Sequence, residues 1–223
     1  KPLVDSGNAE ALYVMGRLIL DGKGVKKNNT RAAEFFRLAA EKGDVSAMNS
    51  WATSLVTGDG VPRNFHEAAR WFRKAADQGY VSAQHNLGVM YDKGQGVLQD
   101  FAQAAAWYRK AAEQGYLEAQ LYLTYLYGYN EVVQDAKQAV YWARKAAEQG
   151  DAEAQLNLGT IYITGQFVAP DLKQAYIWNS VAAANGLALA AATRDSIAKR
   201  LTPAELEAAQ ETAARYFEQY KPN

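Results

Sequence analysis

The residue types that most often carry out catalysis or bind metals are scarce in this sequence. Its 223 residues include no cysteine and only two histidines, His66 and His85. The lack of cysteine excludes disulfides, cysteine nucleophiles and thiolate metal sites. A catalytic or metal-binding histidine needs converging partners, and His85 has only Asp92 two helical turns away. We therefore expect no catalytic, metal or cofactor site and no enzyme, with His66 on the surface and His85 either contacting a partner or solvated.

Three Gly-x-Gly motifs could in principle cradle a phosphate group. They span residues 22–24, 58–60 and 94–96. None has the third glycine, the preceding strand or the immediate helix start that a phosphate-binding loop needs. All three fall at the same point of a sequence repeat, between two expected helices. We interpret them as turns whose glycines adopt positive φ.

Pairs of basic residues recur in the same repeat and could suggest an anion site. They are Arg73-Lys74, Arg109-Lys110 and Arg144-Lys145. Each pair falls at the end of an expected helix, where positive charge favours the helix dipole. Glu113 and Glu148 follow at distances that allow ion pairing. A solvated outer face is therefore the better interpretation.

The charge balance limits the class of partner. The chain has 24 basic and 24 acidic side chains, which argues against a nucleic-acid binder and against a polybasic membrane-surface protein. No run of about 18 apolar residues predicts a transmembrane segment. The chain begins at Lys1, so we expect a trimmed or mature fragment, in which a removed signal peptide would not be visible.

Glycines mark an internal repeat that runs through most of the chain. They stand at Gly7, Gly43, Gly79, Gly115, Gly150 and Gly186, so the spacings are 36, 36, 36, 35 and 36 residues. Alanines, leucines and tryptophans recur in the same frame. We predict a single domain of five repeats at about 7–42, 43–78, 79–114, 115–149 and 150–185. A degenerate sixth unit and a capping helix take up residues 186–223.

Each unit is expected to contain two helices. In the third unit, residues 82–92 and 101–114 place their apolar side chains on one helical face. The residues that should cap the second helices are Asn28, Asn64, Asp100, Asp135 and Asp171. A last helix should begin at Thr202-Pro203-Ala204-Glu205 with a capping box and run to about Tyr220. Stacked helix pairs of this kind form an all-α solenoid.

The third unit carries a motif made of Ala83-Gln84, Leu87-Gly88, Tyr91, Gly94, Gly96-Val97, Asp100, Ala104, Trp107, Lys110-Ala111-Ala112 and Gln114-Gly115. This motif resembles the Sel1-like repeat, a relative of the tetratricopeptide repeat. The resemblance implies a right-handed α-solenoid superhelix of antiparallel helix pairs, in which the first helices line a concave groove. It also implies a bacterial member that binds another protein, and we favour the periplasm over the cytoplasm as its location. The family's cysteine-rich branch is excluded, because the chain has no cysteine.

Groove residues are expected just after the Gln, Gly and Tyr positions of each first helix. By this rule the protein-binding candidates include Tyr13, Arg17, Asn49, Thr53, His85, Val89, Asp92, Leu121, Tyr125, Leu156, Thr160 and Ile163. The helix ends add Asp21, Thr57, Lys93, Tyr129 and Thr164.

The fourth unit departs from the pattern. Its motif glycine is Thr124, and its Gly-x-Gly turn has shrunk to Asn130-Glu131. Tyr127 holds the core position of the motif, whereas Tyr122, Tyr125 and Tyr129 are additional tyrosines. Tyrosine is common at binding hot spots, so these three side chains are binding candidates. The alternative is that they only repack the shortened turn.

Three non-enzymatic roles agree with the sequence. The first is an interaction module that binds a partner protein in its groove. The resemblance also allows an immunity protein that neutralises a secreted toxin, such as a type VI secretion phospholipase, or a scaffold of the cell envelope or of motility. The partner's identity and the oligomeric state are not predicted.

Overall fold

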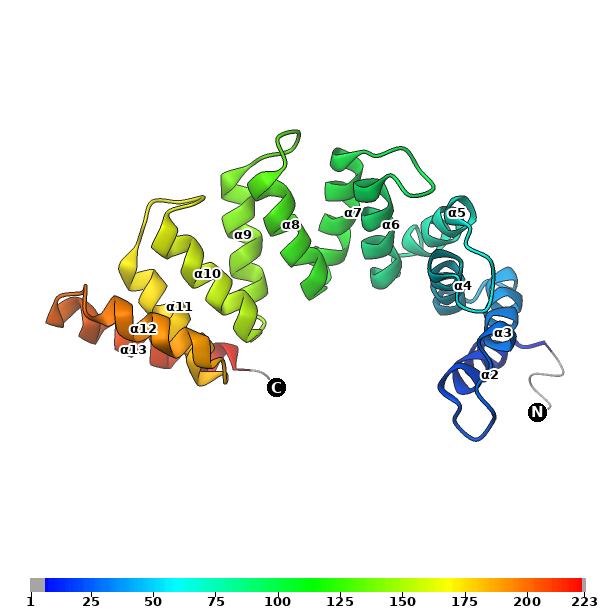
Figure 1. Ribbon diagram of the computed structural model, residues 1–223, viewed down its shortest axis with the longest axis horizontal. Helices are drawn as coiled ribbons and strands as arrows, with labels where there is room; N and C mark the ends of the chain where they lie inside the picture. Colours follow the sequence, from blue (N-terminus) through cyan, green and yellow to red (C-terminus); the bar gives the residue numbers. More distant parts are fainter. Residues whose placement is uncertain (1–6, 222–223) are drawn as a thin grey trace. The chain divides into compact units, whose positions relative to one another are not determined.

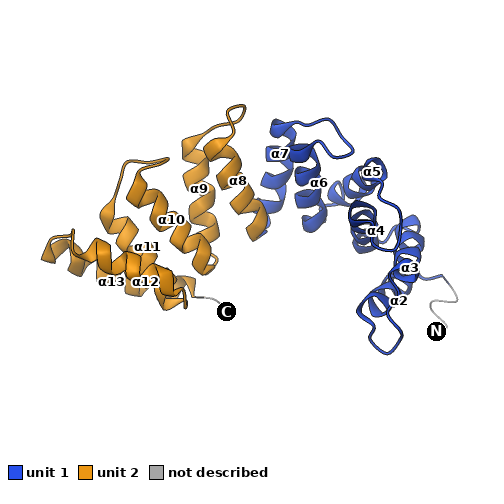
Figure 2. Ribbon diagram, viewed as in Figure 1, with its two compact units in different colours: residues 1–116 blue, residues 117–223 orange. Residues whose placement is uncertain are grey.

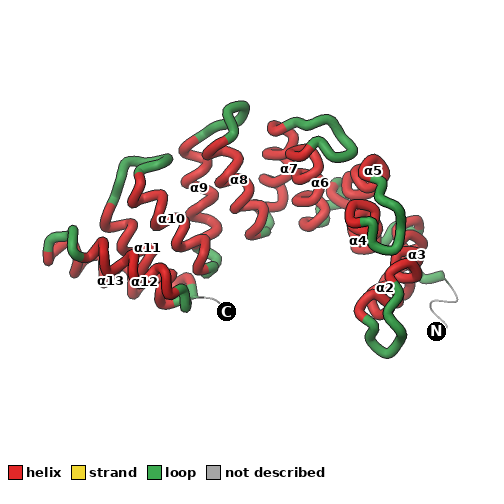
Figure 3. Tube along the Cα trace, viewed as in Figure 1, coloured by secondary structure: helices red, strands yellow, loops and turns green. Residues whose placement is uncertain are grey.

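The computed structural model describes residues 7–221, which form twelve helices and no strand (Figures 1 and 3). The expected all-α solenoid is confirmed. The helices are α2 (Ala9–Asp21), α3 (Asn29–Glu41), α4 (Val45–Thr57), α5 (Phe65–Ala76), α6 (Val81–Lys93), α7 (Phe101–Glu113), α8 (Leu117–Tyr129), α9 (Ala136–Ala147), α10 (Ala152–Thr164), α11 (Leu172–Ala184), α12 (Ala188–Ala198) and α13 (Pro203–Tyr220).

The helices pack in consecutive pairs, as the repeat predicts. The pairs α2–α3, α4–α5, α6–α7, α8–α9 and α10–α11 are each in extensive contact. By these contacts the chain divides into two compact units, one up to residue 116 and one from residue 117 onward (Figure 2). The first contains α2–α7 and the second contains α8–α13, each with its own apolar core. A single domain remains a prediction.

Side-chain caps fix where the helices begin. All five predicted caps of the second helices are confirmed, because each side chain accepts a hydrogen bond from a backbone N–H in the first turn. Asn8, Asp44 and Asp151 cap first helices in the same way, which was not predicted. The spaced glycines and the Gly-x-Gly glycines all have positive φ, as expected of turns. The helix ends are therefore set by short-range chemistry.

In two of the first helices, the motif glycine lets an aromatic ring approach closely. A Cβ atom on Gly88 of α6 would lie 2.7 Å from the ring of Tyr108 on α7, and one on Gly16 of α2 would lie 2.7 Å from Phe36 on α3. Both rings are buried. At these two positions a larger residue would therefore displace a buried ring.

Buried glutamines add polar contacts to the third, fourth and fifth helix pairs. The Gln84 amide nitrogen donates to the carbonyl oxygen of Ala76, and the Gln84 side-chain oxygen accepts from Gln114 at 2.8 Å. In the next two repeats Gln149 donates to Gln120 at 2.7 Å, and Asn185 donates to Gln155 at 2.9 Å. In these three repeats the glutamine thus ties the start of the repeat to its end.

Helix α13 covers the C-terminal end of the second unit. Its predicted capping box is present: Thr202 accepts from the Glu205 backbone, and Glu205 accepts from the Thr202 backbone. Tyr216 and Tyr220 lie 5.2 and 5.8 Å from the fully buried ring of Trp178, measured between ring centroids. This confirms the predicted capping helix, which shields the last repeat from solvent.

Candidate functional site

The predicted groove residues all lie on the first helices α2, α4, α6, α8 and α10, and none is fully buried. Those with exposed side chains are Arg17, Asp21, Thr53, Thr57, Lys93, Tyr122, Tyr125, Tyr129, Thr160 and Thr164. Those that are half-buried are Tyr13, Asn49, His85, Val89, Asp92, Leu121, Leu156 and Ile163. Placement on one set of helices is therefore as expected, but the residues do not gather at one place.

In the first compact unit, which contains α2–α7, some of the predicted groove residues line two pockets. The larger, of about 330 Å³, lies between α2 and α4 and includes Arg17, Asn49 and Thr53. Its rim is charged, because Asp21 and Asp59 line it as well. The smaller, of about 130 Å³, lies between α4 and α6 and includes Thr53 and Val89.

His85 is enclosed by aromatic rings. Its centroid lies 5.4 Å from that of Tyr108 and 5.1 Å from that of Tyr116. His85 lines neither pocket described above. Its side chain is half-buried, which excludes a fully solvated histidine, and it packs against Tyr108 of α7. His66, in contrast, is exposed in the first turn of α5, as predicted.

Asp92 stands near the end of α6, where the equivalent first-helix residues are Leu20, Val56, Gly128 and Ile163. Desolvation raises the pKa of its carboxyl above the ordinary value, and the positive charge of Lys93 opposes this shift. Among residues 7–221, no cluster of three histidine, aspartate or glutamate side chains could hold a metal ion. Nor does any helix in that range have the length and apolarity to cross a bilayer.

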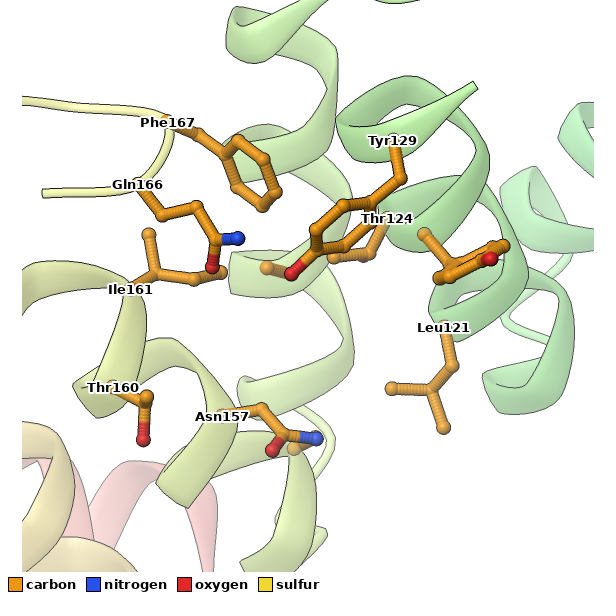
Figure 4. A pocket seen from close by; sticks show the side chains of 11 residues that line it. Leu121, Thr124, Tyr129, Asn157, Thr160, Ile161, Gln166 and Phe167 are labelled. Atoms are coloured by element: carbon orange, nitrogen blue, oxygen red, sulfur yellow. The ribbon is translucent and has the colours of Figure 1, made fainter. Parts of the chain in front are cut away.

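The second compact unit, which contains α8–α13, has a pocket of about 340 Å³ beside the additional tyrosines of α8 (Figure 4). Helix α8 supplies one wall and α10 the other, with Ala143 of α9 between them. The lining residues are Leu121, Thr124, Tyr125, Tyr129, Ala143, Ala154, Asn157, Thr160, Ile161, Gln166 and Phe167. Four predicted residues, Leu121, Tyr125, Tyr129 and Thr160, therefore share one site, whereas Tyr122 and Leu156 do not line it.

The tyrosines contact neighbouring rings at the mouth of this pocket. The rings of Tyr125 and Tyr129 lie 5.2 Å apart in a tilted arrangement, and Tyr129 meets the edge of Phe167 at 5.3 Å. Figure 4 shows Phe167 and Tyr129 pointing toward one another. Tyr125 is 63% exposed and Tyr129 is 51% exposed, so both present large areas to solvent. Tyr127 is buried, as predicted.

Sequence reasoning missed Phe167, Asn157 and Gln166. Phe167 takes the place of the second glycine of the Gly-x-Gly turn, since Gly60 and Gly96 are its equivalents. A Cβ atom on Gly128 of α8 would collide with the Phe167 ring. Two departures from the repeat could have revealed this contact. The fifth repeat has Phe167 in place of a glycine, and the fourth has Gly128 in place of a larger residue.

The interpretation of the basic pairs as solvated was wrong for two arginines. Arg73 is half-buried: its guanidinium lies 5.1 Å from the centroid of the Trp107 ring and donates to the phenolic oxygen of Tyr91. Arg144 is also half-buried and donates to Tyr162. Lys145 does form the expected exposed ion pair, with Glu148 at 3.3 Å. The arginines join neighbouring helix pairs, because a guanidinium combines planar stacking with directed hydrogen bonds.

Comparisons with known proteins agree with the repeat. The Sel1 repeat profile matches residues 9–44, 45–80, 81–116, 117–151 and 152–187. A solved Sel1 repeat protein from Oxalobacter formigenes is 31% identical, with a TM-score of 0.76 over 94% of this chain and 88% of that one.

Two more distant structures share the fold alone. One is an immunity protein from Pseudomonas aeruginosa, with 22% identity and a TM-score of 0.51 over 96% of this chain and 82% of that one. The other is a Sel1 repeat protein from Klebsiella pneumoniae, with 19% identity and a TM-score of 0.53 over 86% of this chain and 94% of that one. No curated protein matches the sequence significantly.

Proposed function

The chain belongs to the Sel1 repeat family, whose solenoids typically mediate protein–protein interaction, and we propose that it binds a partner protein through the pocket lined by α8 and α10. The observation that carries the proposal is the exposed pair Tyr125 and Tyr129, whose rings are in contact at the mouth of that pocket. Two large rings with few rotatable bonds offer binding area at little cost in conformational entropy.

The proposed role is non-enzymatic. The sequence has no cysteine and two histidines, and those two lie apart: His66 is exposed on α5 and His85 is packed between two tyrosine rings on α6. Neither histidine lines the pocket beside the tyrosines. A binding protein needs no converging acid and base, and the pocket offers none.

The test is to replace Tyr125 and Tyr129 with alanine and measure affinity for a partner captured from the native organism. Loss of such hot-spot rings is expected to weaken binding by about 2 kcal/mol or more. Tyr141→Ala is the matched control, because Tyr141 is 49% exposed on α9 and lies outside the pocket. Unchanged affinity of the double variant, with an unchanged helical melting curve, would contradict the proposal.

The immunity and scaffold roles are narrower versions of the same activity. The similarity to an immunity protein stands at 22% identity and supports the fold only. The gene neighbourhood separates the two: a toxin gene beside this one supports immunity, and an envelope or motility operon supports a scaffold. A periplasmic location is part of the proposal, and a reporter fused to the full-length gene product measures it.

A further inference from the structure

One position of the repeat carries an aromatic ring in the first three units and a methyl group in the fourth. The equivalent residues on α3, α5, α7 and α9 are Phe36, Phe72, Tyr108 and Ala143. The three rings are buried inside their own helix pairs. Helix α9 therefore lacks, at this position, the ring that α3, α5 and α7 each carry.

The residue that faces this position has a larger side chain in the fourth repeat than in the first and third. Where Gly16 and Gly88 leave room for rings, the fourth unit has Thr124. A threonine side chain is much smaller than a tyrosine ring, so Thr124 and Ala143 together fill less space than Gly88 and Tyr108 do. Both Thr124 and Ala143 line the pocket of about 340 Å³, so the pocket reaches the place where a ring would otherwise lie.

Two further exchanges shape the walls of this pocket. Phe167 replaces a glycine of the turn, and Gly128 replaces a larger residue and accepts the Phe167 ring. The result is a pocket with aromatic walls. Phe167 and Tyr129 are in edge contact, and the ring of Tyr125 lies tilted against that of Tyr129. Aromatic walls of this kind favour another aromatic group, through edge and offset contacts.

The charge of the lining residues defines the occupant more narrowly. None of the eleven lining residues is charged, whereas Arg17, Asp21 and Asp59 line the equivalent pocket between α2 and α4. A charged side chain in the pocket would lose hydration without gaining an opposite charge. The occupant is therefore uncharged.

Two amide side chains at the pocket are available to a ligand. In the third unit, Asn86 donates to Asn49 at 3.1 Å. In the fifth unit the equivalent asparagine is Asn157, but the equivalent of Asn49 is Leu121, which cannot bond to it. Asn157 and Gln166 are exposed and make no hydrogen bond within residues 7–221. A side-chain amide can both donate to and accept from a peptide main chain.

We propose that this pocket binds a phenylalanine, tyrosine or tryptophan side chain from an extended, uncharged segment of the partner protein, with Asn157 and Gln166 bonding to the segment's main chain. The inference rests on the proposed function and adds to it the chemistry of the bound segment. A volume of about 340 Å³ exceeds that of one aromatic side chain and lies at the lower end of the size range of ligand pockets.

The probe is a set of peptides Ac-Gly-Gly-Ser-X-Ser-Gly-Gly-NH2, with X as Phe, Tyr, Trp, Leu, Glu or Lys, titrated into isotope-labelled full-length chain. Amide NMR shifts are followed at Thr124, Ala143 and Asn157. The three aromatic peptides are expected to bind about tenfold or more tightly than the leucine peptide, because they bury more apolar area. The charged peptides should not bind. Equal binding of all peptides, or none by the aromatic ones, would overturn the proposal.

A variant that rebuilds the ring inside the repeat gives the specific test. Thr124→Gly combined with Ala143→Phe restores the pairing of Gly16 with Phe36, so it should fold and should reduce aromatic-peptide binding at least about tenfold. Tyr129→Ala, which removes one wall without adding bulk, is the second variant if the first does not fold. Retained binding in the folded variants would sink the idea.

The same titrations separate other occupants and separate this inference from the proposed function. If acetyl-phenylalanine amide binds as tightly as the phenylalanine peptide, the site takes a small molecule, and the peptide proposal fails. A concentration-dependent dimer that Thr124→Gly with Ala143→Phe abolishes would make the occupant a second copy and would also overturn it. If a captured partner loses affinity with Tyr125→Ala and Tyr129→Ala but the ring-restored variant binds it normally, the proposed function stands and this inference falls.

Discussion

The guanidinium of Arg144 donates a hydrogen bond to the phenolic oxygen of Tyr162 at 2.6 Å. Arg144 lies in the last turn of α9 and Tyr162 lies on α10, so the bond joins one helix pair to the next. The same relationship links Arg73 on α5 to Tyr91 on α6 in the first unit. This contact explains why a basic residue and a tyrosine recur in the repeat at a fixed distance.

Tyr162→Phe should therefore destabilise the protein by about 1–3 kcal/mol, because it leaves the half-buried Arg144 without its acceptor. Urea unfolding followed by circular dichroism measures the change. Tyr141→Phe is the control, since Tyr141 is exposed. Equal stabilities of the two variants would show that the bond contributes nothing.

Gly96→Ala and Gly24→Ala should differ, although both glycines have φ near +70°. Each substitution costs about 1–2 kcal/mol for a left-handed alanine. A Cβ atom on Gly96 would also overlap the carbonyl oxygen of Phe65, whereas one on Gly24 would meet nothing within 4 Å. Gly96→Ala should lose about 1–3 kcal/mol more. Thermal melts of the two variants decide this, and identical losses would refute the close approach of the turn to α5.

Asp92→Asn should make the protein relatively more stable at neutral pH. Because burial raises the folded-state pKa of Asp92 above its ordinary 3.8, ionising this carboxyl costs more in the folded chain than in the unfolded one. The cost is absent below pH 3.8 and is complete once the pH exceeds the raised value. The difference in unfolding free energy between Asp92→Asn and the parent should thus grow from pH 3.5 to pH 7 and then level off. A difference that shrinks with rising pH would contradict the assigned direction.

Gln155 and Asn185 should be energetically coupled. Gln155 is fully buried, accepts from Asn185 and donates to the carbonyl oxygen of Ala147. Gln155→Ala should cost about 1–3 kcal/mol, because it leaves buried polar groups without partners. A double-mutant cycle with Asn185→Ala should give a coupling energy of about 0.5–3 kcal/mol. Strict additivity would mean that the two side chains act independently.

The fold could be predicted from the sequence because local chemistry repeats in it. Asp100, Asp135 and Asp171 cap helices wherever the frame places them, and the spaced glycines end helices in every unit. The capping helix was equally readable from Thr202 and Glu205. Such signals act over a few residues, so one sequence contains them in full.

The site could be predicted only in part, because it depends on contacts between units. The repeat frame of the sequence correctly predicted that Tyr125 and Tyr129 are exposed. It could not show that Phe167, almost forty residues further on, completes the pocket with Tyr129. Nor could it show that His85 lies between two tyrosine rings or that Arg144 is held by Tyr162. These relationships depend on which side chains meet across helix pairs, and helical periodicity within one segment carries no such information.

The exchange of Tyr108 for Ala143, and of a turn glycine for Phe167, has a consequence for engineering this scaffold. One wall of the pocket comes from the fourth repeat and the other from the fifth, so no single repeat can be transplanted with its recognition chemistry intact. A graft would have to carry residues 117–167 as one cassette. For the same reason, a new binding specificity at this site requires substitutions in two adjacent repeats. The smallest segment that can be exchanged together with its binding site is therefore longer than one 36-residue repeat.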